Sequence, residues 1–137
     1  MNSDFSISVD DQAIATITWD CEKKSMNVLS FEALETLEKL IDQVINDDQI
    51  IAGIITSGKR DFAAGMDLNV LAQLKQSAGE NPAEGVFNGV MKMHSVLRKI
   101  ELAGMDPKTK KGGKPIVSVL PGTALGIGLE IPLSTHR

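Results

Sequence analysis

Two short apolar segments constrain the fold of this chain more than any other feature. Residues 50–55 and 116–120 are rich in Ile and Val and lack the apolar–polar alternation of a half-exposed strand. Such segments are typical of strands covered on both faces, as in a layered α/β protein. Each is followed by a glycine-bearing loop and then by a helical pattern. We therefore expect an α/β domain in which strands alternate with helices.

The segment before residue 50 predicts a hairpin and a helix. Residues 5–9 alternate apolar and polar side chains, and residues 13–19 are rich in Ile and Thr, which indicates two paired strands. Ser30 is a candidate N-cap for an amphipathic helix over residues 31–46. This part of the chain is therefore expected to place one helix against a small sheet.

The segment after residue 60 predicts further helices. Apolar spacing indicates a short helix from residue 68 and a long helix over residues 86–100. Residues 76–84 contain Gly and Pro and predict a loop between them. The order of elements is then β-β-α-β-α-α-β-α, again typical of an α/β domain.

Composition narrows the class of protein. The chain has 137 residues and a net charge of −4, which fits one domain and argues against non-specific nucleic-acid binding. With one cysteine, Cys21, and two histidines, neither an intramolecular disulfide nor a transition-metal site is expected. No apolar run approaches membrane-spanning length, and no signal-peptide pattern opens the chain. We expect a cytoplasmic protein with no membrane or nucleic-acid partner.

Residues 62–68 (FAAGMDL) form the first of two glycine turns. They lie between an apolar segment and a helical pattern, and the small residues at 63–65 let a ligand approach the backbone closely. The first N–H groups of a helix have no partner inside it and attract anions. From these residues alone, two interpretations are about equally supported. One is an anion site, and the other is a plain connection between strand and helix with Asp67 as the helix N-cap.

Residues 121–130 (PGTALGIGLE) repeat this layout after the second apolar segment. A lone G-x-G is weak evidence, because it also serves close packing of a helix on a strand. The third glycine of a dinucleotide fingerprint is missing, the carboxylate of Glu130 would repel a phosphate, and there is no Walker lysine. The turn therefore predicts neither a dinucleotide nor a nucleotide-triphosphate site.

Glu130 is a candidate general acid or base. Its neighbours Leu129 and Ile131 predict apolar surroundings for the carboxylate, which suits proton transfer. The alternative is an acid in the first helical turn, stabilised by the helix dipole. Pro132 requires either that the helix begins near Glu130 or that it is distorted there.

Taken in order, the two turns resemble elements of the enoyl-CoA hydratase/isomerase (crotonase) superfamily. Residues 62–68 resemble its F-x-A-G-x-D-[LI] element. Residues 114–130 resemble its K-P-[VI]-x-A-x-x-x-G-x-A-x-G-x-G-x-E element, with Ser118 in place of the usual alanine. Residues 26–30 are similar to the short element before the family's first helix. The resemblance implies a crotonase-like α/β spiral of ββα units over residues 1–137, truncated before the C-terminal part of that domain.

The resemblance also implies roles for individual residues. Met66 and Ile127 would each supply a backbone N–H to an oxyanion hole, and Glu130 would be the first of two catalytic glutamates. The second glutamate is expected beyond Arg137. The substrate-binding turns would be formed by Ala64, Gly65, Asp67, Gly126 and Gly128.

The implied reaction is hydration of a 2-trans-enoyl-CoA to the 3-hydroxyacyl-CoA in fatty-acid β-oxidation. The alternatives are an acyl-CoA-binding fragment without turnover and another crotonase reaction, such as enoyl-CoA isomerisation. No cofactor is expected, since coenzyme A is part of the acyl-CoA substrate. Residues 123–133 are similar to the hydratase half of bifunctional fatty-oxidation proteins, so NAD would enter only with a following dehydrogenase domain. A trimer-based homo-oligomer is implied by the resemblance. A truncated core also predicts exposed apolar surface and therefore association.

The remaining candidate residues have weaker interpretations. The lysines at 108–114 favour a solvated loop. The alternative is that they attract a phosphate-bearing ligand, such as CoA, which Arg60 could also bind. His94 lies on a largely apolar helix, which favours packing over catalysis. His136 stands too close to the end of the chain to interpret.

Overall fold

The computed structural model describes residues 4–77 and 79–136. Its elements follow the predicted order, with two additional short strands. They are β1 (Phe5–Val9), β2 (Ile14–Trp19), β3 (Val28–Leu29), α1 (Phe31–Asn46), β4 (Ala52–Ser57), β5 (Gly65–Met66), α2 (Leu68–Ser77), α3 (Pro82–Leu102), β6 (Ile116–Ser118) and α4 (Ile127–Leu133).

The main sheet has the strand order β1-β2-β4-β6. β1 and β2 form the predicted antiparallel hairpin, with Phe5 opposite Trp19. β4 runs parallel to β2, and β6 runs parallel to β4. A second, two-stranded sheet pairs β3 with β5 in parallel. Because β4 and β6 are parallel, the loops that follow them leave the sheet at the same edge.

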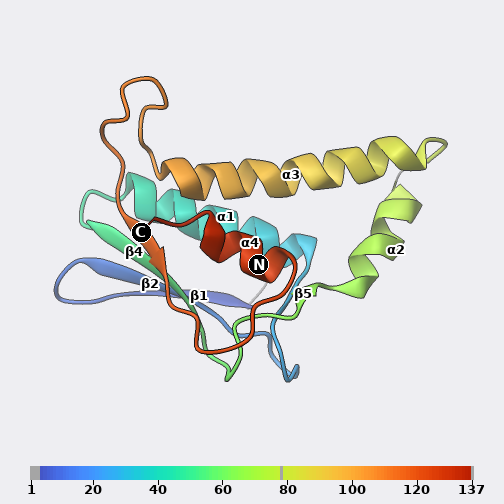
Figure 1. Cartoon of the computed structure of the whole chain (residues 1–137), viewed down its shortest axis with the longest axis horizontal. Coiled ribbons are helices and arrows are strands. Elements are labelled where there is room, and N and C mark those ends of the chain that lie inside the picture. The colour runs from blue at the N-terminus through green and yellow to red at the C-terminus, as the bar shows by residue number, and fades with distance from the viewer. Residues whose placement is uncertain (1–3, 78, 137) are drawn as a thin grey trace.

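One face of the main sheet is covered, and the helices gather on that side (Figure 1). β4 alternates between half-buried and buried residues, and Ile51 just before it is 59% exposed. In β6, Val117 is exposed. The expectation that both segments are covered on both faces is therefore wrong. In the described part of the chain, the apolar side chains on the second face of β4 and β6 are exposed or half-buried.

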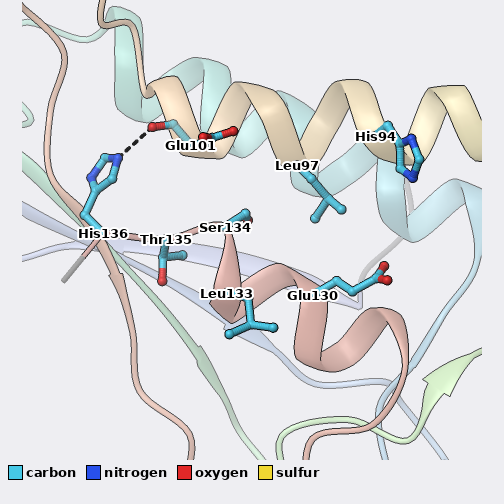
Figure 2. A pocket seen from close by; sticks show the side chains of 8 residues that line it. All are labelled: His94, Leu97, Glu101, Glu130, Leu133, Ser134, Thr135 and His136. Carbon is cyan, nitrogen blue, oxygen red and sulfur yellow. Dashed lines mark hydrogen bonds between the residues drawn. The ribbon is translucent and has the colours of Figure 1, made fainter. Parts of the chain in front are cut away.

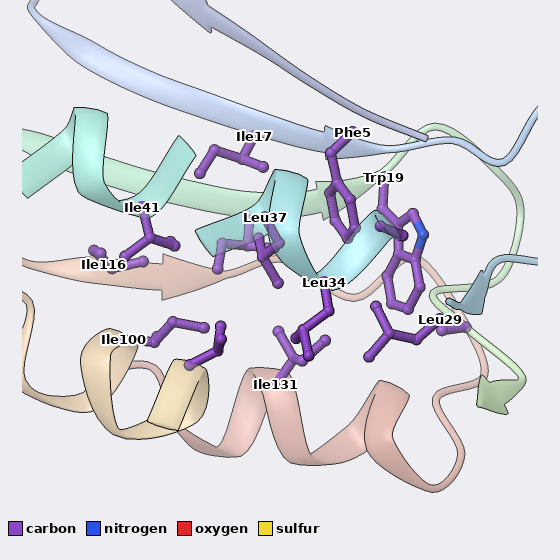
Figure 3. Packing of buried hydrophobic residues seen from close by; sticks show 14 of the residues in the cluster. Phe5, Ile17, Trp19, Leu29, Leu34, Leu37, Ile41, Ile100, Ile116 and Ile131 are labelled. Carbon is purple, nitrogen blue, oxygen red and sulfur yellow. The ribbon is translucent and has the colours of Figure 1, made fainter. Parts of the chain in front are cut away.

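The core lies between the sheet and the helices (Figure 3). Trp19 stacks on Phe5 with ring centroids 5.0 Å apart and meets the edge of Phe62 at 5.9 Å. Ile100 from α3 and Ile131 from α4 are buried in the same cluster. Full burial of a side chain of this size contributes roughly 1.5–3 kcal/mol. Phe62 thus fixes the start of the first glycine turn to the centre of the core.

Helix α1 has the bounds and the N-cap that the sequence predicts. The hydroxyl of Ser30 accepts a hydrogen bond from the Ala33 N–H at 3.0 Å. On its outer side, Lys99 of α3 donates to Glu38 at 2.9 Å and to Asp42 at 3.0 Å. The Lys99 and Lys92 ammonium groups hold the pKa of Glu38 below its usual range. These contacts fix α3 along α1.

The connection between α2 and α3 is shorter than predicted. Residues 76–84 do not form one loop, because α2 continues to Ser77 and α3 begins at Pro82. Residue 78, within the predicted loop, lies outside the described residues. The Asn81 side chain accepts from the Glu84 N–H at 3.4 Å, and proline is favourable at a first helical position. These local features outweigh the loop signal of Gly79 and Pro82.

Candidate active site

The first glycine turn lies at β5, beside β3. The Ala64 N–H donates to the Asn27 carbonyl at 2.8 Å, and the Asp67 N–H donates to the Leu29 carbonyl at 2.9 Å. Gly65 between them has φ 115°, a conformation that residues with a Cβ rarely adopt. A Cβ there would also lie 3.3 Å from the Leu125 carbonyl oxygen of the second turn. Glycine is therefore required where the two turns approach each other.

The second glycine turn leads directly into α4. Gly126 is the residue before the helix, has φ 54°, and provides no side-chain cap for its first N–H groups. Within the described residues, no acceptor is found for the N–H of Ile127, the first helical residue. α4 continues through Pro132, which has no N–H to donate back along the helix, and it ends at Leu133. The helix therefore begins before Glu130, and Pro132 lies inside it.

Backbone hydrogen bonds join the two turns to each other. Ala63 and Ala124 form a parallel bridge, with the Leu125 N–H donating to the Ala63 carbonyl at 3.0 Å. The Phe62 N–H donates to the Thr123 carbonyl at 2.8 Å. Gly128 is buried against Ala63, where a Cβ would lie only 2.6 Å from the Ala63 Cβ. The structure thus brings together two segments about sixty residues apart in the sequence.

A side chain reinforces this junction. The Asp61 carboxylate accepts the Thr123 N–H at 2.8 Å, and this hydrogen bond holds the pKa of Asp61 below its usual range. A Cβ on Gly122 would lie 2.7 Å from both the Arg60 carbonyl and the Asp61 carboxylate. The loop after β4 and the loop after β6 therefore fit each other closely.

A cavity of about 320 Å³ opens in front of the joined turns. Met66, Gly126, Ile127 and Glu130 all contribute to its wall, so four of the predicted site residues meet there. Helix α3 closes the other side. The lining residues are Met66, Val90, Met93, His94, Gly126, Ile127 and Glu130.

A second cavity of about 540 Å³ lies alongside the first and also includes Glu130 and His94. Figure 2 shows it between α3 and α4, with Leu97 and His94 projecting from one helix and Glu130 and Leu133 from the other. Glu130 is exposed. The apolar surroundings predicted for its carboxylate are therefore wrong, because its neighbour Ile131 points into the core while Leu129 is exposed.

The other predicted site residues have structural contacts. The Asp67 carboxylate forms an ion pair with Lys24 at 2.6 Å and accepts the Asn69 N–H at 2.9 Å. Both contacts, with Lys24 first, lower the pKa of Asp67, and its capping position fits one of the alternatives raised by the sequence. Ala64 is exposed beside the turn, whereas Gly65 and Gly128 are buried behind it. Substrate contact by these residues stays a prediction.

Sequence reasoning missed Asn27, whose side chain organises the first turn. Asn27 is fully buried, and its amide lies 2.9 Å from each of the Trp19 carbonyl, the Ser57 hydroxyl and the Phe62 carbonyl. Its side-chain oxygen accepts the Cys21 N–H at 2.9 Å. A polar residue between Met26 and Val28 was the available signal, since a buried amide there needs partners.

Two expectations about basic residues and histidines are corrected. His94 is exposed and lines both cavities, so its expected packing role is wrong. Lys114 is not part of a solvated loop, because its ammonium group donates to the Val44 and Asp47 carbonyls at the end of α1, at 2.9 and 2.6 Å. Lys108, Lys110 and Lys111 are exposed, in a hairpin beyond the end of α3 that lies away from β5 (Figure 1).

The described residues contain no group of three or more His, Cys, Asp or Glu side chains arranged to bind a metal ion. Within the same residues, no helix has the length and apolarity needed to cross a membrane.

The joined turns and the sheet define a mixed α/β domain in which Met66, Ile127 and Glu130 line one cavity. The chain belongs to the enoyl-CoA hydratase/isomerase family, because a sequence model of that family matches residues 14–136. The family resemblance that the two motifs predict is thereby confirmed.

Individual relatives support this assignment. The chain is 28% identical over 138 positions to the fatty acid oxidation complex subunit alpha of Shewanella oneidensis, covering 100% of the chain and 17% of that protein. It is 29% identical over 123 residues to a short-chain-enoyl-CoA hydratase of Clostridium acetobutylicum, covering 89% of the chain and 40% of that protein. A solved enoyl-CoA hydratase structure from Shewanella pealeana matches with a TM-score of 0.79 at 14% identity, covering 96% of the chain and 44% of that structure.

These comparisons confirm the crotonase-like α/β fold. The chain spans less than half the length of these three relatives. It therefore corresponds to one part of each of these longer proteins.

Proposed function

We propose that this chain carries the thioester-binding part of an enoyl-CoA hydratase site, acting on 2-trans-enoyl-CoA substrates. The observation that supports the proposal most is the cavity where Met66, Ile127 and Glu130 meet in front of the two joined glycine turns. Family membership and the names of the relatives point to the same substrate class.

In this proposal, the two turns act on the carbonyl of the thioester. The backbone N–H groups of Met66 and Ile127 donate to the carbonyl oxygen and stabilise the negative charge of the enolate. Removing one such donor costs about 3–4 kcal/mol of transition-state stabilisation in other enzymes with an oxyanion hole. Since the donors belong to the backbone, the glycines that shape the turns matter more than the Met66 and Ile127 side chains.

Glu130 acts on water. It takes a proton from the water molecule as the oxygen forms a bond to the β-carbon, and the electrons of the double bond move into the enolate. The α-carbon then receives a proton from a second acid–base group. The net change is addition of one H and one OH across the double bond.

The variant Glu130→Gln, made in a full-length version that supplies the second acid–base group, tests this role. With crotonyl-CoA as substrate, we expect kcat to fall by about 100-fold or more, because the amide cannot accept the proton. Glu101→Gln is a matched control, since Glu101 lines the neighbouring cavity but is paired with Arg98 at 2.6 Å. Undiminished hydration by the Glu130→Gln protein would remove Glu130 from the mechanism.

A second candidate function is acyl-CoA binding without turnover. It is favoured by the fact that Glu130 is the one carboxylate among the described residues lining the cavity at the turns. Titration of crotonyl-CoA by calorimetry, together with the hydration assay, separates the two functions. Binding without hydration supports the second candidate. Conversion of a 3-enoyl-CoA to a 2-enoyl-CoA in the same preparation would indicate an isomerase instead.

We also propose a cytoplasmic, homo-oligomeric protein that uses no cofactor for this step. Cys21 is a free, buried thiol, and burial raises its pKa, which suits an unreactive cysteine in a reducing compartment. Exposed apolar side chains in β6 and α4 favour association. NAD would be required only if a dehydrogenase domain follows.

A further inference from the structure

His94 and Glu130 face the same space from two different elements. Both residues line the cavity at the glycine turns and the larger cavity beside it. In Figure 2, the His94 ring projects from α3 and the Glu130 carboxylate projects from α4 into the larger cavity between the helices. Among the described residues that line either cavity, the titratable side chains are His94, Glu101, Glu130 and His136.

Two of these four groups have structural partners. The Arg98 guanidinium pairs with Glu101 and holds the pKa of that carboxyl below its usual range. His136 uses both ring nitrogens, because Nδ1 accepts the Ile116 N–H at 3.0 Å and Nε2 lies 2.8 Å from the Glu101 carbonyl. His136 therefore ties the end of the chain to β6 and α3, and neither group is available for chemistry.

The other two groups have no such partner. Within the described residues, neither the His94 ring nor the Glu130 carboxylate forms a hydrogen bond or an ion pair. His94 also belongs to the face of α3 that lines the cavities. The residues of this face recur at spacings of three and four, namely Val90, His94, Leu97 and Glu101. The fold thus presents one acceptor-capable ring and one carboxylate to the cavity that Met66 and Ile127 also line.

We propose that His94 binds the attacking water molecule together with Glu130. A neutral imidazole has one nitrogen that can accept a hydrogen bond, and it accepts from one O–H of the water. Glu130 accepts from the other O–H and takes that proton as the oxygen bonds to the β-carbon. His94 transfers no proton in this step, so its contribution is to orient the water. The inference rests on the hydratase function proposed above.

The test compares three single variants in crotonyl-CoA hydration, each made in the full-length version that supplies the second acid–base group. In His94→Phe, a ring of similar size cannot accept a hydrogen bond, and we expect kcat to fall about 100-fold with KM changed less than about threefold. In His94→Gln, the side-chain amide oxygen can accept a hydrogen bond from the water. We therefore expect its kcat to be about tenfold higher than that of His94→Phe. Ser95→Ala is the matched control, since Ser95 is the next residue on α3 and lines neither cavity. It should retain the wild-type rate.

A double variant separates orientation of the water from a general effect on the structure. If His94 and Glu130 act on the same water, then Glu130→Gln combined with His94→Phe should lose little more activity than Glu130→Gln alone. Multiplying losses would overturn the proposal, as would a His94→Phe protein with kcat within twofold of the wild type. Wild-type protein without any hydration activity would instead overturn the hydratase function, and this inference with it.

Discussion

Asn27 is the single residue whose side chain connects most of the structure behind the site. It joins the end of β2 through Trp19, the end of β4 through Ser57, and the first glycine turn through Phe62. The partners are backbone carbonyls and a hydroxyl group. Asn27 itself is fully buried. If the amide were removed, the Phe62 carbonyl and the Cys21 N–H would lose their hydrogen-bond partner. The position of the Met66 turn therefore depends on a residue that takes no part in chemistry.

We expect Asn27→Ala to lower the free energy of unfolding by about 3 kcal/mol, because a buried polar group left without a partner costs roughly 1–3 kcal/mol. Asn88→Ala, at an exposed position of α3, is the control and should change stability by less than about 0.5 kcal/mol. Urea denaturation followed by circular dichroism measures both. Equal stabilities for the two variants would contradict the connecting role of Asn27.

Gly128 and Ala63 provide a paired test of how closely the two turns pack. A Cβ at Gly128 would lie 2.6 Å from the Ala63 Cβ, so Gly128→Ala should destabilise the protein by about 1–3 kcal/mol. The double variant Ala63→Gly/Gly128→Ala moves the methyl group to the other side of the contact and should recover part of this loss. Thermal unfolding of the three proteins is the measurement. No recovery in the double variant would show that the contact is not what excludes a larger residue at 128.

At the scale of elements, Asp61 joins the loop after β4 to the loop after β6. The Thr123 N–H lowers the pKa of Asp61. The carboxylate therefore stabilises the folded state at pH values above the ordinary pKa of an aspartate, about 3.9. That contribution is lost as the pH falls through the lower, folded-state pKa. We therefore expect wild-type protein to be more stable than Asp61→Asn at neutral pH, and the difference to shrink below about pH 4.

Chemical denaturation at neutral pH and at about pH 2.5 measures this difference, the lower value lying below the ordinary pKa of an aspartate. Asp48→Asn removes a charge from an exposed turn elsewhere and controls for the change in net charge. A wild-type advantage that persists unchanged at the lower pH would show that the Asp61 charge is not responsible.

The sequence predicted those elements whose signals are local. α1 has its predicted bounds because Ser30 and the apolar stripe after it lie within one segment. β4 begins at Ala52, two residues later than predicted, because pairing with β2 starts at Ile14 opposite Ala52, and no local pattern encodes that register. β3 and β5 have two residues each and leave no periodic signal.

The same distinction holds for the site. Met66, Ile127 and Glu130 were found through their motifs, and the structure places all three at one cavity. Asn27 was missed, and packing was wrongly favoured for His94, because the surroundings of both residues depend on contacts between distant segments. The exposure of Glu130 could not be read from its neighbours, since adjacent residues on a helix face different directions.

At the scale of the whole molecule, the last part of the chain exposes several large apolar side chains. Val119, Leu125, Leu129 and Leu133 are 52%, 53%, 42% and 69% exposed. These side chains follow or belong to β6 and α4, the two elements that build the second turn. Surface of this kind is normally covered by other protein.

We therefore expect the 137-residue chain to associate, with a sedimentation mass above the 14.7 kDa of a monomer. Leu133→Glu should shift the equilibrium toward the monomer, because a carboxylate in an apolar contact must lose its hydration. Leu68→Glu is the matched control, since Leu68 is 82% exposed on α2, away from β6 and α4, and should leave association unchanged. Analytical ultracentrifugation over a concentration series measures all three proteins. A monomeric wild type, or an equal shift in both variants, would contradict association through β6 and α4.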